Sequence, residues 1–265
     1  MELEKICNQT IGIVRNAGAY ILAQQNENLA PGIEEKGRHD FVTEVDKKTE
    51  EMLVDALGKL LPGSGFIAEE GTQADRGEEY QWIIDPIDGT TNFIHGAYPF
   101  AVSVALAKNR KPIMGVILEL GFNECFYGWS GGGAWLDGKP ISVSGNRTLD
   151  SSLIATGFPY SDYSKLDGFM RSMDWFMKHS RGLRRLGSAA TDIAWVACGR
   201  YDGFYEYGLH PWDVAAGVVI LEEAGGRSAD FKGGDDYLFG EEIICSNGLN
   251  HNEFIDTIKQ LMNGS

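Results

Sequence analysis

The segment that most constrains this chain is Trp82–Phe93, which reads Trp-Ile-Ile-Asp-Pro-Ile-Asp-Gly-Thr-Thr-Asn-Phe. Its apolar start predicts a buried strand that leads directly into a turn carrying Asp85 and Asp88. Buried carboxylates are costly unless they are paired or bind a cation. Gly89 allows the backbone to approach a ligand, and a helical turn that begins near Thr90 directs free N–H groups toward an anion. The segment therefore predicts a cation site beside an anion site.

Three further acidic elements fit the same chemistry. They are Glu69-Glu70 at the end of a strand, Asp213 at the start of a very apolar helix, and Asp46 at the start of another helix. Taken alone, Asp46 and Asp213 are better explained as helix-capping acids, and Glu69-Glu70 as a solvated loop. Together with Asp85 they form a set of hard oxygen ligands that select Mg²⁺, whereas the scattered histidines and cysteines do not favour zinc.

The composition of the 265 residues excludes several classes of protein. Hydrophobic residues make up 43% of the chain, which excludes a disordered chain. The 38 acidic and 23 basic residues give a formal charge of −15, which disfavours general binding to nucleic acid or to anionic membranes. The cysteines lie far apart, the N-terminus is acidic where a signal peptide is basic, and no apolar run is long enough to cross a membrane. These features predict a cytoplasmic protein with reduced thiols.

The first half of the chain is predicted to contain two helices followed by a sheet. Apolar stripes predict helices at about residues 3–21 and 43–61, separated by a polar loop at about residues 26–38. Residues 66–144 have the short runs punctuated by glycine that are typical of an antiparallel sheet.

The second half alternates between predicted strands and helices, which indicates an α/β arrangement. The helix around residues 214–221 is apolar nearly all round, so we expect it to lie between other layers. We place a boundary near residue 146. Residues 1–146 then carry most of the candidate metal ligands, residues 147–265 carry Asp213, and the two parts pack as one compact unit.

The acidic motifs resemble those of the inositol monophosphatase family, whose members are Mg²⁺-dependent, lithium-sensitive phosphatases, and the sequence is most similar in style to bacterial members. The first family signature matches Glu69-Glu70 and Trp82–Phe93, and the second matches Trp212–Gly217 and Glu223–Gly226. The resemblance spans nearly the whole chain. It implies an α/β fold of five layers, the αβαβα sandwich of the inositol monophosphatase and fructose-1,6-bisphosphatase type, and a homodimer.

The same resemblance implies which residues hold two or three Mg²⁺ ions. One ion would be held by Glu69, Asp85 and the backbone carbonyl of Ile87. A second would be held by Asp85, Asp88 and Asp213, and a weaker third by Glu69 and water.

The resemblance also implies how the substrate is held. The backbone N–H groups of Gly89 and Thr90 would hold the phosphate, and Asp46 with Thr90 would orient the attacking water, so that Asp46, Glu69 and Thr90 form the catalytic set. The substrate pocket would be lined by Gly187, Ser188, Ala189, Glu206 and Asp213.

The reaction expected from this resemblance is hydrolysis of myo-inositol 1-phosphate to inositol and phosphate by direct attack of a metal-activated water. Glu206 favours a small polyhydroxylated substrate, because a carboxylate accepts hydrogen bonds from hydroxyls and repels a second phosphate. Relatives on this scaffold act on other phosphates, so fructose-1,6-bisphosphatase, nucleotide 3′-phosphatase and histidinol phosphatase activities stay open as alternatives.

The most basic stretch of the chain is Arg181–Arg185, and its sequence is compatible with three functions. The three hypotheses are a salt-bridged face at a dimer interface, a contact to the substrate phosphate, and a docking patch for a macromolecule through Arg184 and Arg185. The last alternative describes a regulatory protein with a secondary phosphatase activity. The complete set of acids argues against a regulator without catalysis, but not against a dual role.

Overall fold

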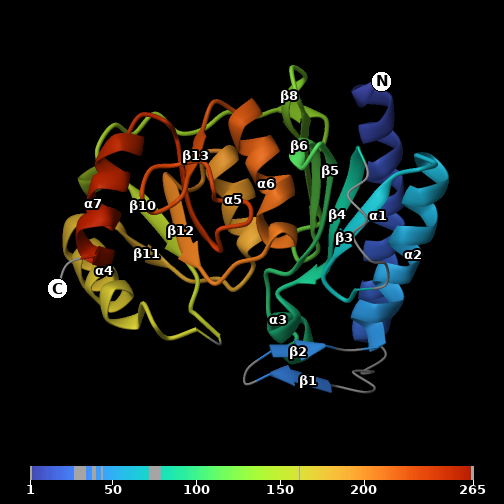
Figure 1. Ribbon diagram of the computed structural model, residues 1–265, viewed down its shortest axis with the longest axis horizontal. Coiled ribbons are helices and arrows are strands. Elements are labelled where there is room, and N and C mark those ends of the chain that lie inside the picture. Colours follow the sequence, from blue (N-terminus) through green and yellow to red (C-terminus); the bar gives the residue numbers. More distant parts are fainter. Residues whose placement is uncertain are drawn as a thin grey trace.

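The computed structural model describes residues 2–26, 34–37, 40–42, 44–71, 79–160 and 162–263 and arranges them in five layers of alternating helices and strands (Figure 1). This order confirms the expected αβαβα sandwich. The first layer consists of α1 (Leu3–Asn26) and α2 (Glu44–Leu60), which pack against each other and cover one face of the first sheet. Both helices have an apolar side that faces this sheet, with Val14, Ile21 and Leu53 fully buried.

The second layer is a seven-stranded sheet in the order β3-β4-β5-β6-β7-β8-β9. β3 and β4 are parallel, and each of the other neighbouring pairs is antiparallel. The central strands are buried on both faces, so β5 is mostly apolar and β4 is apolar from Trp82 to Ile84, before its two acids. The strands are β3 (Gly65–Ala68), β4 (Tyr80–Asp88), β5 (Ala101–Lys108), β6 (Lys111–Glu119), β7 (Glu124–Trp129), β8 (Gly133–Leu136) and β9 (Lys139–Pro140).

The third layer is a pair of helices between the two sheets, α5 (Ala189–Ala197) and α6 (Pro211–Glu223). Val214 to Leu221 of α6 are all buried, which confirms the expectation that this helix is enclosed. Small residues allow the close approach: a Cβ added to Gly115 of β6 would lie 2.3 Å from the carbonyl oxygen of Ala216. The backbones of strand and helix are therefore in direct contact.

The fourth and fifth layers are a five-stranded sheet and the helices on its outer face. The strand order is β11-β10-β12-β14-β13, with β10 parallel to β11 and β12, and β14 antiparallel to β12 and β13. The outer helices bury aromatic rings against this sheet, among them Phe169, Phe176 and Phe254. The elements are β10 (Leu153–Thr156), β11 (Gly182–Arg184), β12 (Gly203–Tyr207), β13 (Arg227–Ala229), β14 (Glu242–Ser246), α4 (Leu166–His179) and α7 (His251–Asn263).

Three short elements complete the fold: the two-stranded hairpin of β1 (Glu34–Gly37) and β2 (Asp40–Val42), the helix α3 (Thr90–His95), and the single 3-10 turn η1 (Leu149–Ser151). The predicted polar loop at 26–38 is wrong in part, because β1 lies within it. The two strands have four and three residues and pair Glu34 with Val42 and Glu35 with Phe41, so each is too short to show the apolar alternation of a half-buried strand.

Three smaller expectations need correction. Among the strands expected in the second half of the chain, the sequence indicates one at Leu183–Leu186; the structure has β11 there, and it ends at Arg184. The sheet expected to be antiparallel contains the parallel pair β3 and β4. The short edge strand β13 was not expected, because three residues carry no measurable periodicity. Thr43, the predicted start of the second helix, lies outside the described residues.

The four cysteines are unpaired, in agreement with the expectation of reduced thiols. In the part of the chain that the structure describes, no helix has both the length and the apolar character needed to cross a bilayer. The boundary proposed near residue 146 lies in the extended segment between β9 and η1, and it stays a prediction.

Candidate active site

Asp85, Asp88 and Asp213 come together at one place in the fold. Asp85 and Asp88 lie at the end of β4, where the register with β5 shifts between them. Asp213 lies in the first turn of α6, which packs against β4 and β5. One oxygen atom from each of the three carboxylates lies within 4.8 Å of the others. The structure therefore builds an acidic cluster from two segments that are far apart in the sequence.

Asp88 is held at the N-terminus of α5. Its Oδ2 accepts hydrogen bonds from the Ser188 hydroxyl at 2.6 Å and from the Ala190 N–H at 2.7 Å. Burial raises the pKa of Asp88 to about 6, although these bonds act in the opposite direction and favour the ionised form. Both bonds are made to Oδ2, so they fix the carboxylate between β4 and α5.

Asp213 and Asp85 complete the cluster, and their carboxylates differ in their hydrogen bonds. Oδ2 of Asp213 accepts the His210 N–H at 2.6 Å, which fixes the carboxylate in the first turn of α6. Oδ1 of Asp85 is buried and has no hydrogen-bond partner among the described residues. Burial raises the pKa of both carboxyls, and the nearby acids raise that of Asp85 further, with Glu69 contributing most. Without a cation, the ionised cluster is unfavourable.

These features fit a bound Mg²⁺. The donors are all carboxylate oxygens, one of them is buried without a partner, and the like charges are too close to stay ionised without a counterion. The structure thus supports the predicted ligand set Asp85, Asp88 and Asp213. Glu69 follows β3 and lies close enough to Asp85 to raise its pKa, so it borders the same cluster.

Asp46 and Thr90 also meet, as the family resemblance implied. Asp46 is fully buried in the first turn of α2, and its Oδ1 lies 3.0 Å from the Thr90 hydroxyl. The same hydroxyl lies 3.0 Å from the carbonyl oxygen of Ile87. A hydroxyl has one proton and donates to one of these acceptors at a time.

Glu50 is a buried acid that the sequence reasoning missed. It lies one turn after Asp46 in α2, and its Oε2 accepts the backbone N–H of Glu70 at 2.7 Å. This bond fixes the turn that carries Glu69. The spacing of Glu50 from Asp46 on one helical face was the available signal.

The predicted phosphate cradle has the expected backbone form. Gly89 has φ of 95°, which only glycine adopts easily, and α3 begins directly after it. Gly187, with φ of 90°, lies against it: a Cβ on Gly89 would lie 2.9 Å from the Gly187 carbonyl oxygen. Asn92 fixes this contact, because its Nδ2 donates to the carbonyl oxygens of Leu186 at 2.8 Å and Pro99 at 2.7 Å.

Glu206 lies in β12, and its carboxylate is in the same neighbourhood as the acidic cluster. It is 7% exposed, and a Cβ on Gly157 would overlap its carboxylate at 2.0 Å. Burial raises the pKa of Glu206, and Asp192 and Asp88 raise it further. Ser188 and Ala189, which begin the neighbouring helix α5, are also buried.

Asp192 is a second acid that the sequence reasoning missed. It is 1% exposed in α5, its Oδ1 has no partner within the described part of the chain, and burial raises its pKa. Nothing in the local sequence separates Asp192 from a first-turn acid of any helix.

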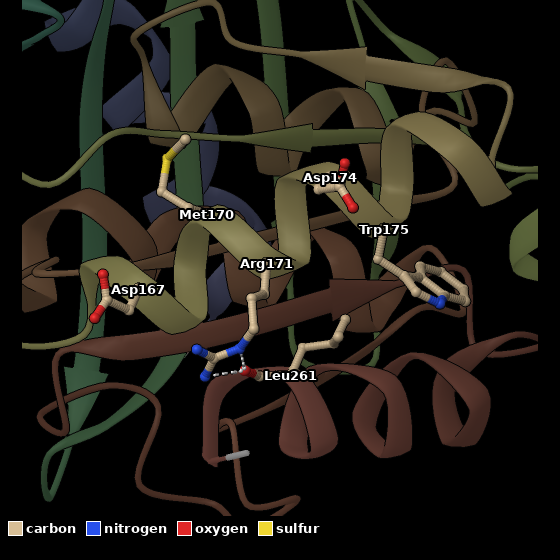
Figure 2. Close-up of a pocket in the computed structure, with 6 residues that line it drawn as sticks. All are labelled: Asp167, Met170, Arg171, Asp174, Trp175 and Leu261. Carbon is tan, nitrogen blue, oxygen red and sulfur yellow. Dashed lines mark hydrogen bonds between the residues drawn. The ribbon is translucent and has the colours of Figure 1, made fainter. Parts of the chain in front are cut away.

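A separate open pocket lies on the outer helical layer, between α4 and α7 (Figure 2). Its lining includes Asp167, Trp175 and Arg171, and the Arg171 guanidinium bonds the Leu261 carbonyl oxygen at 3.0 and 3.2 Å. None of the residues in the acidic cluster lines this pocket, so it is not the candidate site.

The comparisons with known proteins agree with this geometry. The model of the inositol monophosphatase family matches residues 2–263. The chain belongs to the inositol monophosphatase family. It is 37% identical to a protein of Pseudomonas aeruginosa named Nus factor SuhB, over 97% of each chain. It is also 37% identical to fructose-1,6-bisphosphatase/inositol-1-monophosphatase of Thermotoga maritima, over 96% of this chain and 95% of that protein.

Solved structures extend the agreement to the whole fold. The inositol monophosphatase of Anabaena has a TM-score of 0.88 and 34% identity, and the match covers 98% of this chain and 97% of that one. Family and structures together indicate a phosphatase, and members of this family are in general Mg²⁺-dependent.

Proposed function

We propose that this chain is a Mg²⁺-dependent phosphomonoesterase that hydrolyses myo-inositol 1-phosphate by direct attack of water. The observation that most supports this proposal is the convergence of Asp85, Asp88 and Asp213 within 4.8 Å, in the same neighbourhood as the buried carboxylate of Glu206. The three aspartates suit cations, and the Glu206 carboxylate suits the hydroxyls of a substrate.

The residues that would hold two or three Mg²⁺ ions are Glu69, Asp85, the carbonyl of Ile87, Asp88 and Asp213. When bound, the ions offset the negative charge, acidify a water molecule and stabilise the oxygen that leaves. Since the Ile87 carbonyl is then a ligand, the single proton of the Thr90 hydroxyl goes to Asp46. The lone pairs of Thr90 are left to accept a hydrogen bond from the attacking water and orient it.

The substrate is held by two different parts of the site. The backbone N–H groups of Gly89 and Thr90 bind the phosphate, where α3 begins. Glu206 accepts hydrogen bonds from the hydroxyls of the polyol, and Gly187, Ser188 and Ala189 line the space between them. These assignments are consistent with the contact of Gly187 with Gly89.

The experiment that tests this proposal is phosphate release from a panel of substrates with and without Mg²⁺. The panel contains myo-inositol 1-phosphate, fructose 1,6-bisphosphate, adenosine 3′,5′-bisphosphate and histidinol phosphate, and Asp88→Asn is the blank. We expect Mg²⁺-dependent release that is fastest for inositol 1-phosphate and lost in the blank. Fastest release from another member would contradict the substrate, and no Mg²⁺-dependent release would contradict the reaction.

A second candidate function concerns macromolecular partners. Several relatives, including the one from Pseudomonas aeruginosa, are named Nus factor SuhB, and the Arg184 guanidinium is exposed and bonds only the carbonyl of its neighbour Leu183 among the described residues. We infer that the chain forms a homodimer and that Arg184 is available for docking. Loss of a co-purified partner in Arg184→Ala, but not in Asp88→Asn, would support docking independent of catalysis, and light scattering measures the dimer.

A further inference from the structure

Two buried acids lie one turn apart on the same face of α2. Asp46 and Glu50 are both fully buried, and residues four apart in a helix are neighbours on its surface. Oδ1 of Asp46 lies 3.0 Å from the Thr90 hydroxyl. Oε2 of Glu50 accepts the backbone N–H of Glu70 at 2.7 Å. One helical face therefore contacts two separate parts of the candidate site, the start of α3 and the turn after β3.

β3 ends in a turn of residues 68–71, and three successive N–H groups of this turn have different acceptors. The last residue of the turn donates to the carbonyl oxygen of the first at 3.3 Å. The N–H of Glu69 donates to the carbonyl oxygen of Ile84 in β4, also at 3.3 Å. The N–H of Glu70 donates to Glu50, and at 2.7 Å this bond is the shortest of the three. It joins the turn to the outer helical layer, where α2 packs against β3 and β4.

The parallel register of β3 and β4 places Glu69 beside Asp85. Ala68 is opposite Ile84, so the residues that follow them along the two strands are neighbours. After burial, the charge of Glu69 is the largest cause of the raised pKa of Asp85, which agrees with this position. β3 has only four residues and lies at one end of the strand order, so within the described sheet β4 alone supports it. The bond to Glu50 gives the turn a second support, from the helical layer.

We propose that Glu50 is a positioning residue of the metal site, which holds the Glu70 N–H and so fixes the turn that presents Glu69 beside Asp85. Its effect is on the affinity for the Mg²⁺ that Glu69 would share, because hydrogen bonds behind a ligand set the ligand's orientation. Glu50 acts through Glu69 and does not itself hold the ion. This inference rests on the proposed function, in which Glu69 is a ligand, and adds to it a residue of the helical layer.

The test compares Glu50→Met with Glu50→Gln by calorimetric Mg²⁺ titration. Both side chains are uncharged, similar in length and good helix formers, but only Gln keeps an oxygen that accepts a hydrogen bond. We expect Glu50→Met to weaken Mg²⁺ binding by about 10- to 100-fold and Glu50→Gln to recover most of this loss. The matched control is Glu51→Met on the next residue of α2. The Glu51 side chain is 56% exposed and pairs with Lys48 at 2.9 Å, so its loss should leave the Mg²⁺ affinity unchanged.

A double-mutant cycle separates positioning from a general structural defect. If Glu50 acts through Glu69, Glu50→Met should cause little further loss of Mg²⁺ affinity in a Glu69→Gln background, because the two changes affect the same ion. A general defect would lower the affinity by the same factor in both backgrounds. Phosphate release gives a second readout: the Mg²⁺ concentration for half-maximal rate should rise by about 10- to 100-fold in Glu50→Met, and saturating Mg²⁺ should restore most of kcat.

Each other outcome has a definite meaning. Wild-type Mg²⁺ affinity in Glu50→Met, or an equal loss with and without Glu69→Gln, would overturn the inference and leave the proposed function intact. Equal weakening in Glu50→Met and Glu50→Gln would also overturn it, since the charge of Glu50 and not its hydrogen bond would then matter. Thermal melts in a chelator show whether each variant folds. If Glu50→Met does not, Glu50→Ala replaces it in the same comparisons, because it also lacks the acceptor and adds no atom to the interior. Absence of Mg²⁺ binding and of Mg²⁺-dependent release in the wild type would contradict the proposed function and the inference with it.

Discussion

The hydroxyl of Ser188 donates a 2.6 Å hydrogen bond to Oδ2 of Asp88, across 100 residues of sequence. The same oxygen accepts the backbone N–H of Ala190, so the carboxylate that ends β4 also caps α5. The Ser188 hydroxyl in addition accepts the N–H of Thr191 as the N-cap of this helix. One serine therefore supports both a candidate metal ligand and a helix of the central layer.

We expect Ser188→Ala to weaken Mg²⁺ binding by about 10-fold or more, because outer hydrogen bonds orient the ligand and favour its ionised form. It should also cost about 1 kcal/mol of stability, since α5 loses its N-cap. Calorimetric Mg²⁺ titration and thermal melts check the two effects, and Ser188→Thr is the control that keeps the hydroxyl. Wild-type Mg²⁺ affinity in Ser188→Ala would show that the Ala190 N–H alone is sufficient.

Asp88→Asn and Asp213→Asn should each abolish turnover, by about 10³-fold or more, because the metal contributes several kcal/mol of charge stabilisation. Both should leave the fold intact and raise the melting temperature of the Mg²⁺-free protein by about 2–5 °C, since each removes one of the like charges. Melts at pH 8 in a chelator measure this, with the exposed Asp150 replaced by Asn as the control. A lower melting temperature would mean that the hydrogen bonds accepted by the carboxylate stabilise the protein more than its repulsion by the other acids destabilises it.

Gly115→Ala should destabilise the protein by about 3 kcal/mol, because the added Cβ would lie 2.3 Å from the Ala216 carbonyl oxygen and neither backbone has room to move. Gly12→Ala is the matched control: Gly12 lies exposed in α1 with no atom within 4 Å of the added carbon, and the change should stabilise the helix by about 0.5–1 kcal/mol. Urea denaturation of both variants measures the difference. Equal stabilities would refute the close contact of β6 and α6.

His251 should make the protein less stable as the pH falls. It is 2% exposed, its Nδ1 lies 2.7 Å from the Ser246 hydroxyl, and burial lowers its pKa from 6.5 to about 4. Between these two values the unfolded chain binds more protons than the folded one, so stability is full above pH 6.5 and is lost as the pH falls toward 4.

We expect the loss due to His251 to reach about 1–2 kcal/mol between pH 7 and pH 5. His251→Asn removes the titration and keeps a polar atom near the position of Nδ1. Denaturation curves at the two pH values should therefore show a smaller loss for the variant than for the wild type. A loss of the same size in both proteins would assign the pH dependence to other groups.

Apolar runs and turn residues in the sequence predicted the strands and helices that such short-range patterns determine. The apolar run before Asp85 is β4, α3 begins at Thr90, and the helix that was apolar all round lies between the sheets. Asp46 and Thr90, which the family resemblance placed together, do meet, whereas the bond between Ser188 and Asp88 was not expected. Their roles in binding and catalysis stay predictions.

The features that could not be predicted from the sequence are mostly those that depend on contacts between segments far apart in the chain. Arg185 and Tyr160 are 25 residues apart, and nothing in either neighbourhood indicates that they touch. Asp192 is an acid in the first turn of a helix, as many solvated acids are, and only the packing of α5 makes it buried. The hairpin of β1 and β2 escaped notice because strands of four and three residues are too short to show an apolar period.

The enclosure of α6 limits how its sequence is free to vary. A helix on the surface has one side on which substitutions cost little, but Val214 to Leu221 have no such side, and Gly217 has an Ile193 carbon within 2.7 Å of the place of an added Cβ. A change at any of these positions alters the contact with one sheet, the other sheet or α5, and all of them support Asp213. Substitutions that this protein tolerates on the outer sides of α1, α4 or α7 are therefore not tolerated in α6. The helix that carries a candidate metal ligand has little room for neutral change.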